Sequence, residues 1–296
     1  MKFMLALLAP AIIAAPAAAQ PSSMQVLNEA GARASTPTLV ERYGADDVRR
    51  GDLRVPPGRG PFPVVILIHG GCWRSDMGGQ VNMAPLADAL ARRGFATWSF
   101  TYRRVGQPGA GWPGTFEDVA AGVDHGRSLG RRYRLDLSRI VIVGHSSGAH
   151  LALWAASRPR LRNPVAGRNP LRAAAVVAID GPGALAPFIG IDARICGQPA
   201  VVPLMGGSPA ERAAEYRLAT PADHLPLGVR TLLVLAGLSR LMEPYAEAAR
   251  AAGEDVVLLT PEGGDHFNIL NPGTPQGSRV VEFIATTALP RPARGN

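Results

Sequence analysis

Cysteine is scarce in this sequence, since the 296 residues include only Cys72 and Cys196. Two cysteines are too few for a fold held together by several disulfide bridges, so apolar burial has to stabilise most of the chain. The sequence alone leaves open whether these two residues form one bridge or remain free thiols.

Long apolar runs are also missing after the first residues, and we therefore expect no transmembrane segment in the mature chain. Residues 1–19 differ from the rest, because Lys2 gives a positive start, an apolar run follows, and three alanines end the segment. This pattern predicts a signal peptide that is cleaved before Gln20. We expect export to the periplasm or secretion, with residues 20–296 forming a single domain.

Clustered charge, internal repeats and metal-ligand spacings are absent as well. The net charge of +8 comes from scattered arginines, and no nucleic-acid-binding module accompanies them. No pair of histidines has the spacing of a metal-binding motif such as H-E-x-x-H. We therefore expect neither a nucleic-acid partner nor a bound metal, and the sequence does not determine the oligomeric state.

Strand-like and helix-like segments alternate from residue 64 onward, which predicts an α/β fold with a mostly parallel, doubly wound sheet. Residues 38–43 and 48–55 predict an antiparallel strand pair ahead of it, and residues 20–37 are expected to form an irregular arm. Residues 184–227 lack a strong period, and we interpret them as an insertion over the carboxyl edge of the sheet, before the penultimate strand. The expected strands of the main sheet cover residues 64–68, 95–102, 140–143, 173–179, 229–236 and 255–260.

The most informative stretch is RIVIVGHSSGAHL, residues 139–151. Its β-branched run predicts a strand buried on both faces, followed by a sharp turn and a helix. A serine at the apex of such a turn needs small residues two positions away on either side, and Gly144 and Gly148 provide them. We therefore interpret Ser146 as a nucleophile at the carboxyl end of a strand, where catalytic groups gather in such folds.

A serine hydroxyl needs a base to remove its proton, and imidazole titrates in the appropriate range. His266 is the candidate, because it follows the last strand in a glycine loop. His145 and His150 are held by the turn and its helix, which favours packing or capping roles. His125 and His224 are interpreted as structural or surface residues.

Acyl transfer also requires N–H donors for the oxyanion of the tetrahedral intermediate. Gly70 and Gly71 follow the strand at residues 64–68 and can turn their amides inward, since no side chain obstructs the approach. The amide of Ser147, directly after the nucleophile, is placed to join them.

Three motifs taken together, HGGCW at residues 69–73, GHSSG at 144–148 and GDH at 264–266, resemble the α/β-hydrolase superfamily. The resemblance is to its kynurenine-formamidase-like and carboxylesterase branch, and it extends over residues 38–288. It implies an acyl-enzyme on Ser146, a small-molecule ester substrate, and no metal or organic cofactor. From their positions, Trp73 and the insertion are expected to shape the substrate pocket.

The catalytic acid departs from the family pattern. The family commonly places an aspartate shortly after the strand at residues 229–236, and residues 237–244 contain none. Glu243 is one candidate, although it precedes Pro244, which is expected to begin a helix at residues 244–252. Asp180, after the preceding strand, is the other candidate and the one that we favour. We do not expect Asp265 to reach the imidazole of the adjacent His266.

The sequence thus predicts a serine esterase that acts on small carboxylic esters. An arylformamidase-like enzyme that cleaves amides is an alternative within the same chemistry. A hydrolase scaffold without activity, which only binds a ligand, is a second alternative, because the acid expected by the family is missing.

Overall fold

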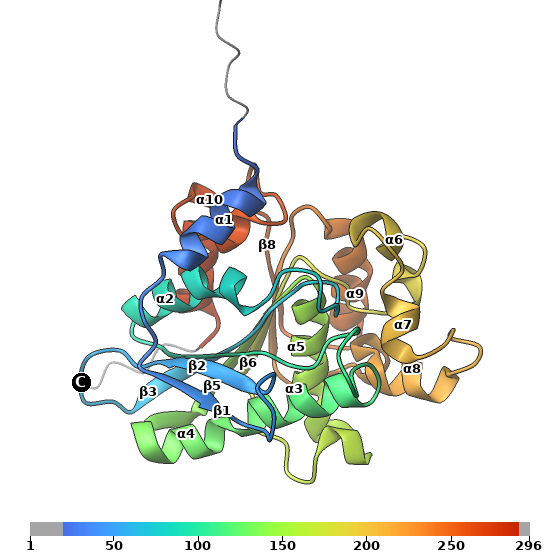
Figure 1. Cartoon of the computed structure of the whole chain (residues 1–296), viewed down its shortest axis with the longest axis horizontal. Helices are drawn as coiled ribbons and strands as arrows, with labels where there is room; N and C mark the ends of the chain where they lie inside the picture. Colours follow the sequence, from blue (N-terminus) through green and yellow to red (C-terminus); the bar gives the residue numbers. More distant parts are fainter. Residues whose placement is uncertain (1–19, 290–296) are drawn as a thin grey trace, which may run out of the picture.

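Eight strands form one sheet through the protein, in the spatial order β1-β2-β4-β3-β5-β6-β7-β8 (Figure 1). The computed structural model describes residues 20–289, so the predicted signal peptide lies outside the described residues. β1 pairs with β2 and β2 with β4 in antiparallel fashion, and all other neighbours are parallel. This confirms the predicted fold class. The strands are β1 (Leu39–Arg42), β2 (Arg50–Arg54), β3 (Phe62–Ile68), β4 (Ala96–Phe100), β5 (Leu135–His145), β6 (Ala175–Ile179), β7 (Arg230–Val234) and β8 (Val256–Leu259).

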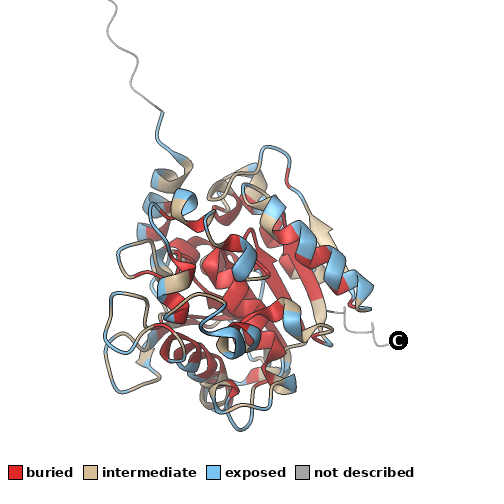
Figure 2. Ribbon diagram, turned by 90° about the vertical axis from the view of Figure 1, so that its right-hand side faces the viewer, coloured by how far each residue is buried: buried red, intermediate tan, exposed pale blue. Residues whose placement is uncertain are grey.

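The central strands are apolar on both faces because the sheet is covered on both. Successive side chains of a strand point to opposite sides. In β5, Ile140 and Ile142 belong to one core cluster, whereas Val141 and Val143 belong to the other. The strands and the helix faces turned toward them are buried, and exposed positions lie on the outer helix faces and loops (Figure 2).

Helices form the two covering layers (Figure 1). α3, α4, α5 and α9 contribute buried side chains to the cluster that contains Ile142, and α1, α2 and α10 contribute to the cluster that contains Val143. No helix among residues 20–289 is long and apolar enough to cross a membrane. The helices are α1 (Ser23–Ala32), α2 (Ala84–Arg92), α3 (Gly114–Asp124), α4 (Gly126–Tyr133), α5 (Ser147–Ser157), α6 (Asp192–Ile195), α7 (Val201–Met205), α8 (Ala213–Ala219), α9 (Ser239–Ala251) and α10 (Pro275–Thr287).

The prediction of an irregular arm at residues 20–37 is wrong, because α1 lies there. A capping box starts the helix: the Ser22 side chain accepts from the Gln25 N–H, and the Gln25 side chain accepts from the Ser22 N–H. Leu27 is fully buried in the second core cluster, and Asn82 donates to Asn28 at 2.6 Å. These contacts fasten α1 to the body of the protein.

The insertion before β7 carries the short helices α6, α7 and α8. A disulfide joins Cys196, at the end of α6, to Cys72 in the loop that follows β3. The bridge that the sequence left open is therefore present in the structure. It connects the insertion to the loop that holds the Gly70-Gly71 pair.

Replacing both cysteines with serine is expected to lower the free energy of unfolding by about 3–5 kcal/mol. The bridge connects residues that are 124 positions apart, so its loss releases a large loop in the unfolded chain. Urea unfolding of the Cys72→Ser/Cys196→Ser protein measures the change. A reductant should weaken the wild type to a similar extent and leave the double variant unchanged, and equal unfolding midpoints would contradict the expectation.

Candidate active site

Ser146 occupies the sharp turn between β5 and α5, with φ 56° and ψ −125°. A positive φ is strained for a residue that carries a side chain. The flanking glycines are required for space: a Cβ on Gly144 would lie 1.9 Å from the Gly148 carbonyl oxygen, and one on Gly148 would lie 2.2 Å from the Ile68 oxygen. The Ser146 N–H donates to the Ile179 carbonyl at 2.9 Å, which ties the turn to the end of β6.

Asp180 follows β6, and its side chain is fully buried. Its Oδ2 accepts a hydrogen bond from His266 Nδ1 at 2.7 Å. Its Oδ1 accepts from the backbone N–H groups of Ala236 and Leu238, both at 2.9 Å. Burial raises the pKa of Asp180, but the hydrogen bond from His266 and the two backbone donors outweigh burial and lower this pKa below its usual value. Asp180 is thus a carboxylate that holds the His266 ring with Nδ1 protonated.

Glu243, the alternative acid, is exposed on α9. The prediction that Pro244 begins this helix is wrong, because α9 begins at Ser239 and Pro244 lies inside it. The proline removes one backbone hydrogen bond near the start of the helix. The Asp180 carboxylate accepts from the N–H of the N-cap residue Leu238, and its negative charge stabilises the first turn. The structure therefore brings Asp180, and not Glu243, to the histidine.

Gly70 lies against Ser146, and Gly70 and Gly71 line the same cavity as this serine. A Cβ on Gly70 would lie 2.9 Å from the Ser146 Cβ, and Gly71 has a φ of 109°. Within residues 20–289, neither the Gly70 nor the Gly71 N–H donates to a backbone carbonyl. Ser147 is the first residue of α5, so its N–H also lies at a helix start, where no intrahelical acceptor exists. All three amides are therefore available to an oxyanion.

A cavity of about 70 Å³ opens beside these groups, and Ser146, His266, Gly70 and Gly71 all line it. The described hydrogen bonds of the His266 ring do not include the Ser146 hydroxyl. Such contacts often form fully only when substrate binds. Within residues 20–289, no three side chains of His, Cys, Asp or Glu gather so that they could hold a metal ion.

The rest of the cavity wall is mostly apolar, and no Asp, Glu, Lys or Arg lines it. Its large apolar side chains come from four distant segments: Met24, Met77, Ile195 and Phe267. Met24 belongs to α1, so the sequence analysis missed this contribution together with the helix. The Ser22-x-x-Gln25 capping pattern was the signal that could have revealed both.

His145 packs against the candidate base. Its Nε2 donates to the His266 backbone carbonyl at 2.8 Å, and the two ring centroids are 4.5 Å apart. Burial and the neighbouring His266 lower the pKa of His145 to about 3, so the ring is neutral near pH 7. His145 thus helps to hold the loop that carries His266.

Trp73 does not line the cavity that was expected to receive the substrate. Its ring is fully buried and packs edge-on against His150 and Phe188. Its backbone N–H donates to the Ser147 Oγ at 3.3 Å. Trp73 therefore fills the core beneath the loop after β3 and fastens that loop to α5.

Acid is expected to destabilise the protein through its buried histidines. Burial lowers the pKa of His69 to about 3, of His145 to about 3 and of His150 to about 4. In the unfolded chain these groups titrate near about 6.5, so below this pH the unfolded state binds protons that the folded state does not. Stability should be complete above about pH 6.5 and should fall toward pH 4, by up to about 1.4 kcal/mol per pH unit for each histidine. Urea unfolding at pH 7, 6, 5 and 4 measures this slope, and His150→Gln should reduce it; a flat profile would disprove the expectation.

Comparisons with known proteins identify the family and the fold of the chain. The BD-FAE family model matches residues 52–246, more than half of the chain. A probable isoprenylcysteine alpha-carbonyl methylesterase, ICMEL1 of Oryza sativa subsp. japonica, is 35% identical over 111 residues, which cover 37% of this chain. The matched segment is only 25% of the length of that relative.

Two solved structures are similar in fold. A truncated carbohydrate esterase from gut microbiota has 22% identity and a TM-score of 0.68, over 84% of this chain and 95% of that chain. Esterase B from Lactobacillus rhamnosis has 18% identity and a TM-score of 0.71, over 89% of this chain and 91% of that chain. The predicted α/β-hydrolase fold is confirmed, and the chain belongs to the BD-FAE family.

Proposed function

We propose that this protein hydrolyses carboxylic esters through an acyl-enzyme formed on Ser146. The observation that carries the proposal is the Asp180–His266 pair, joined at 2.7 Å, beside a cavity that the strained Ser146 also lines. A buried carboxylate, an imidazole and a serine at a turn are the groups that serine hydrolysis requires.

The proposed reaction begins when the Ser146 hydroxyl attacks the ester carbonyl carbon and gives its proton to His266 Nε2. Asp180 keeps Nδ1 protonated and stabilises the imidazolium. The amides of Gly70, Gly71 and Ser147 donate to the oxyanion. His266 then protonates the leaving alcohol, the acyl-enzyme forms, and a water activated by the same imidazole releases the acid.

The size and the lining of the cavity favour a substrate with a small, uncharged acyl or alcohol group. Its volume is about 70 Å³, and apolar side chains such as Met24 and Phe267 supply most of its wall. No charged side chain lines it to balance a charge on the substrate. The name of the rice relative, a probable methylesterase, is consistent with ester rather than amide cleavage.

Labelling with a fluorophosphonate tests the proposal, because the probe phosphonylates an activated serine. We expect one adduct on the peptide that contains Ser146, and turnover of p-nitrophenyl acetate and butyrate that exceeds turnover of the decanoate. N-formylanilide serves as the amide counterpart, and faster cleavage of this compound would favour the arylformamidase alternative. A folded protein with neither adduct nor turnover would instead support a binding scaffold.

We also propose that the protein is exported after removal of residues 1–19. The N-terminal pattern of charge, apolar run and small residues supports this. N-terminal sequencing of the protein from the periplasmic fraction or medium should begin at Gln20, and a cytoplasmic chain that retains Lys2 would refute it.

A further inference from the structure

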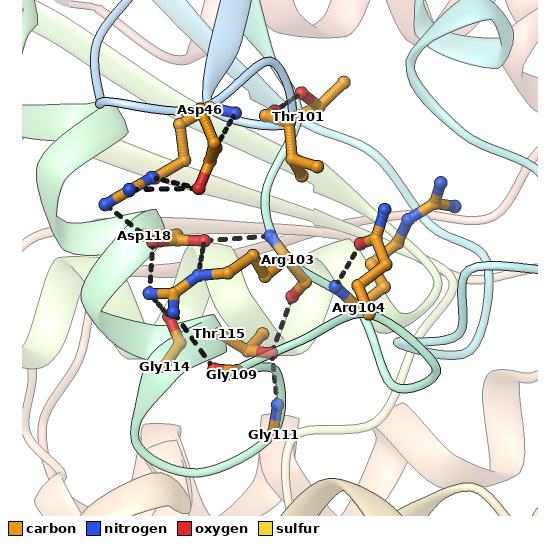
Figure 3. Close-up of polar contacts among 12 residues, drawn as sticks. Asp46, Thr101, Arg103, Arg104, Gly109, Gly111, Gly114, Thr115 and Asp118 are labelled. Carbon is orange, nitrogen blue, oxygen red and sulfur yellow. Dashed lines mark hydrogen bonds and ion pairs between the residues drawn. The ribbon is translucent and has the colours of Figure 1, made fainter.

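Arg103 and Arg104 lie in the loop that begins after β4 ends at Phe100, and the Arg103 side chain contacts Asp118 (Figure 3). Arg103 forms a two-pronged ion pair with Asp118, in which Nε and a terminal nitrogen each lie 2.7 Å from a different carboxylate oxygen. Asp118 is only 1% exposed and also accepts from the Arg103 backbone N–H at 2.9 Å. This arrangement fixes the chain at the start of the loop and thereby fixes the base of the next side chain, Arg104.

Arg104 reaches the loop that follows β3. One terminal nitrogen of its guanidinium donates to three backbone carbonyls: Arg74 at 3.2 Å, Met77 at 3.2 Å and Gly78 at 2.7 Å. Bonds from a charged donor are stronger than bonds between neutral groups. A peptide carbonyl and the N–H of the same peptide point in opposite directions, so a carbonyl held on Arg104 cannot turn its oxygen toward the cavity.

The residues that Arg104 holds are neighbours of the candidate oxyanion donors. Met77 and Gly78 line the same cavity as Ser146. Gly71 packs so closely on Gly78 that a Cβ on Gly71 would lie 2.3 Å from the Gly78 oxygen, which is the oxygen that Arg104 binds at 2.7 Å. A shift of Gly78 would therefore be transmitted directly to Gly71.

The charge of Arg104 also acts on this loop. Burial lowers the pKa of His69, the residue before Gly70, to about 3, and the positive charge of Arg104 is the second cause of this lowering. A positive charge this close to the loop favours negative charge at the oxyanion position.

We propose that Arg104 is a positioning residue, which holds the loop after β3 so that the amides of Gly70 and Gly71 face the oxyanion. The inference rests on the proposed ester hydrolysis. It adds a residue that lies outside the catalytic motifs and acts through the backbone of residues 74–78 and through its positive charge. Lysine keeps a positive charge and three N–H donors on one nitrogen, but its ammonium lies at a different reach from the backbone than the guanidinium nitrogen, so it should reproduce the role only in part.

Kinetics of Arg104→Gln and Arg104→Lys test the proposal, with Arg59→Gln as the matched control. Arg59 is exposed and lies before the amino end of β3, whereas Arg104 lies beyond the carboxyl end of the parallel strand β4. Oxyanion contacts act mainly in the transition state, so we expect Arg104→Gln to lower kcat by about 30- to 100-fold with KM changed less than about threefold. The affinity for a trifluoromethyl ketone, which forms a tetrahedral adduct with serine, should fall by the same factor. Arg104→Lys should restore part of kcat and part of the affinity for the ketone, and the Arg59→Gln control should match the wild type.

The results of these measurements distinguish a failure of the role of Arg104 from a failure of the proposed ester hydrolysis. Variants that remain folded by circular dichroism and keep wild-type kcat and ketone affinity would overturn the role of Arg104 alone. A rise in KM with unchanged kcat would also overturn it, because uniform binding is not oxyanion positioning. If Arg104→Gln fails to fold, the Arg104→Lys protein decides by the same two measurements. A wild-type protein with neither turnover nor adduct on Ser146 would overturn the proposed function and this inference with it.

Discussion

Replacing Ser146 with alanine is expected to lower kcat for ester hydrolysis by about 10⁵- to 10⁶-fold. The alanine has no nucleophile to offer, and no neighbouring group can take over. The hydroxyl of Ser147 is already an acceptor for the backbone N–H of Trp73 at 3.3 Å, and Ser147 is 2% exposed. The residual rate would come from the oxyanion donors and the cavity alone.

Burst kinetics with p-nitrophenyl acetate measure this effect, together with fluorophosphonate labelling of the same variant. Ser138→Ala is the matched control, since Ser138 is exposed near the start of the same strand, β5. The control should retain wild-type turnover and label normally. Turnover by Ser146→Ala within tenfold of the wild type would refute the acyl-enzyme on this residue.

Asp180→Asn is expected to lower kcat by about 10⁴-fold, whereas Glu243→Gln should stay within about twofold of the wild type. The backbone N–H groups of Ala236 and Leu238 both donate to Oδ1, so an asparagine would place its oxygen there. Its NH₂ group would then face His266 Nδ1, where the aspartate accepts at 2.7 Å. An imidazole that accepts at Nδ1 carries its proton on Nε2, and this tautomer cannot remove a proton from serine.

Steady-state rates of the two variants distinguish the acids that the sequence left open. Unfolding of Asp180→Asn in urea should accompany the kinetics, because the substitution also removes a charge from the start of α9. Loss of activity in Glu243→Gln, with activity preserved in Asp180→Asn, would reverse the assignment.

Much of the fold could be predicted from local patterns. The β-branched run in β5 and the apolar runs in β3 and β6 are recognisable because strands buried on both faces leave no polar positions. The antiparallel pair β1–β2 and the order of strands and helices followed from alternation and turn residues. α1 was missed because its start depends on the side chains of Ser22 and Gln25.

By itself, the sequence determined the α/β class, the serine between two glycines and the late histidine, since each depends on residues that are close together in the chain. Only the tertiary structure placed Asp180, and not Glu243, against His266, joined Cys72 to Cys196, and placed Met24 in the cavity wall. It also placed Trp73 in the core rather than at the cavity. The physical reason is the same in each case: these contacts join segments that are far apart in the chain, and their distances depend on how the helices and loops pack against the sheet.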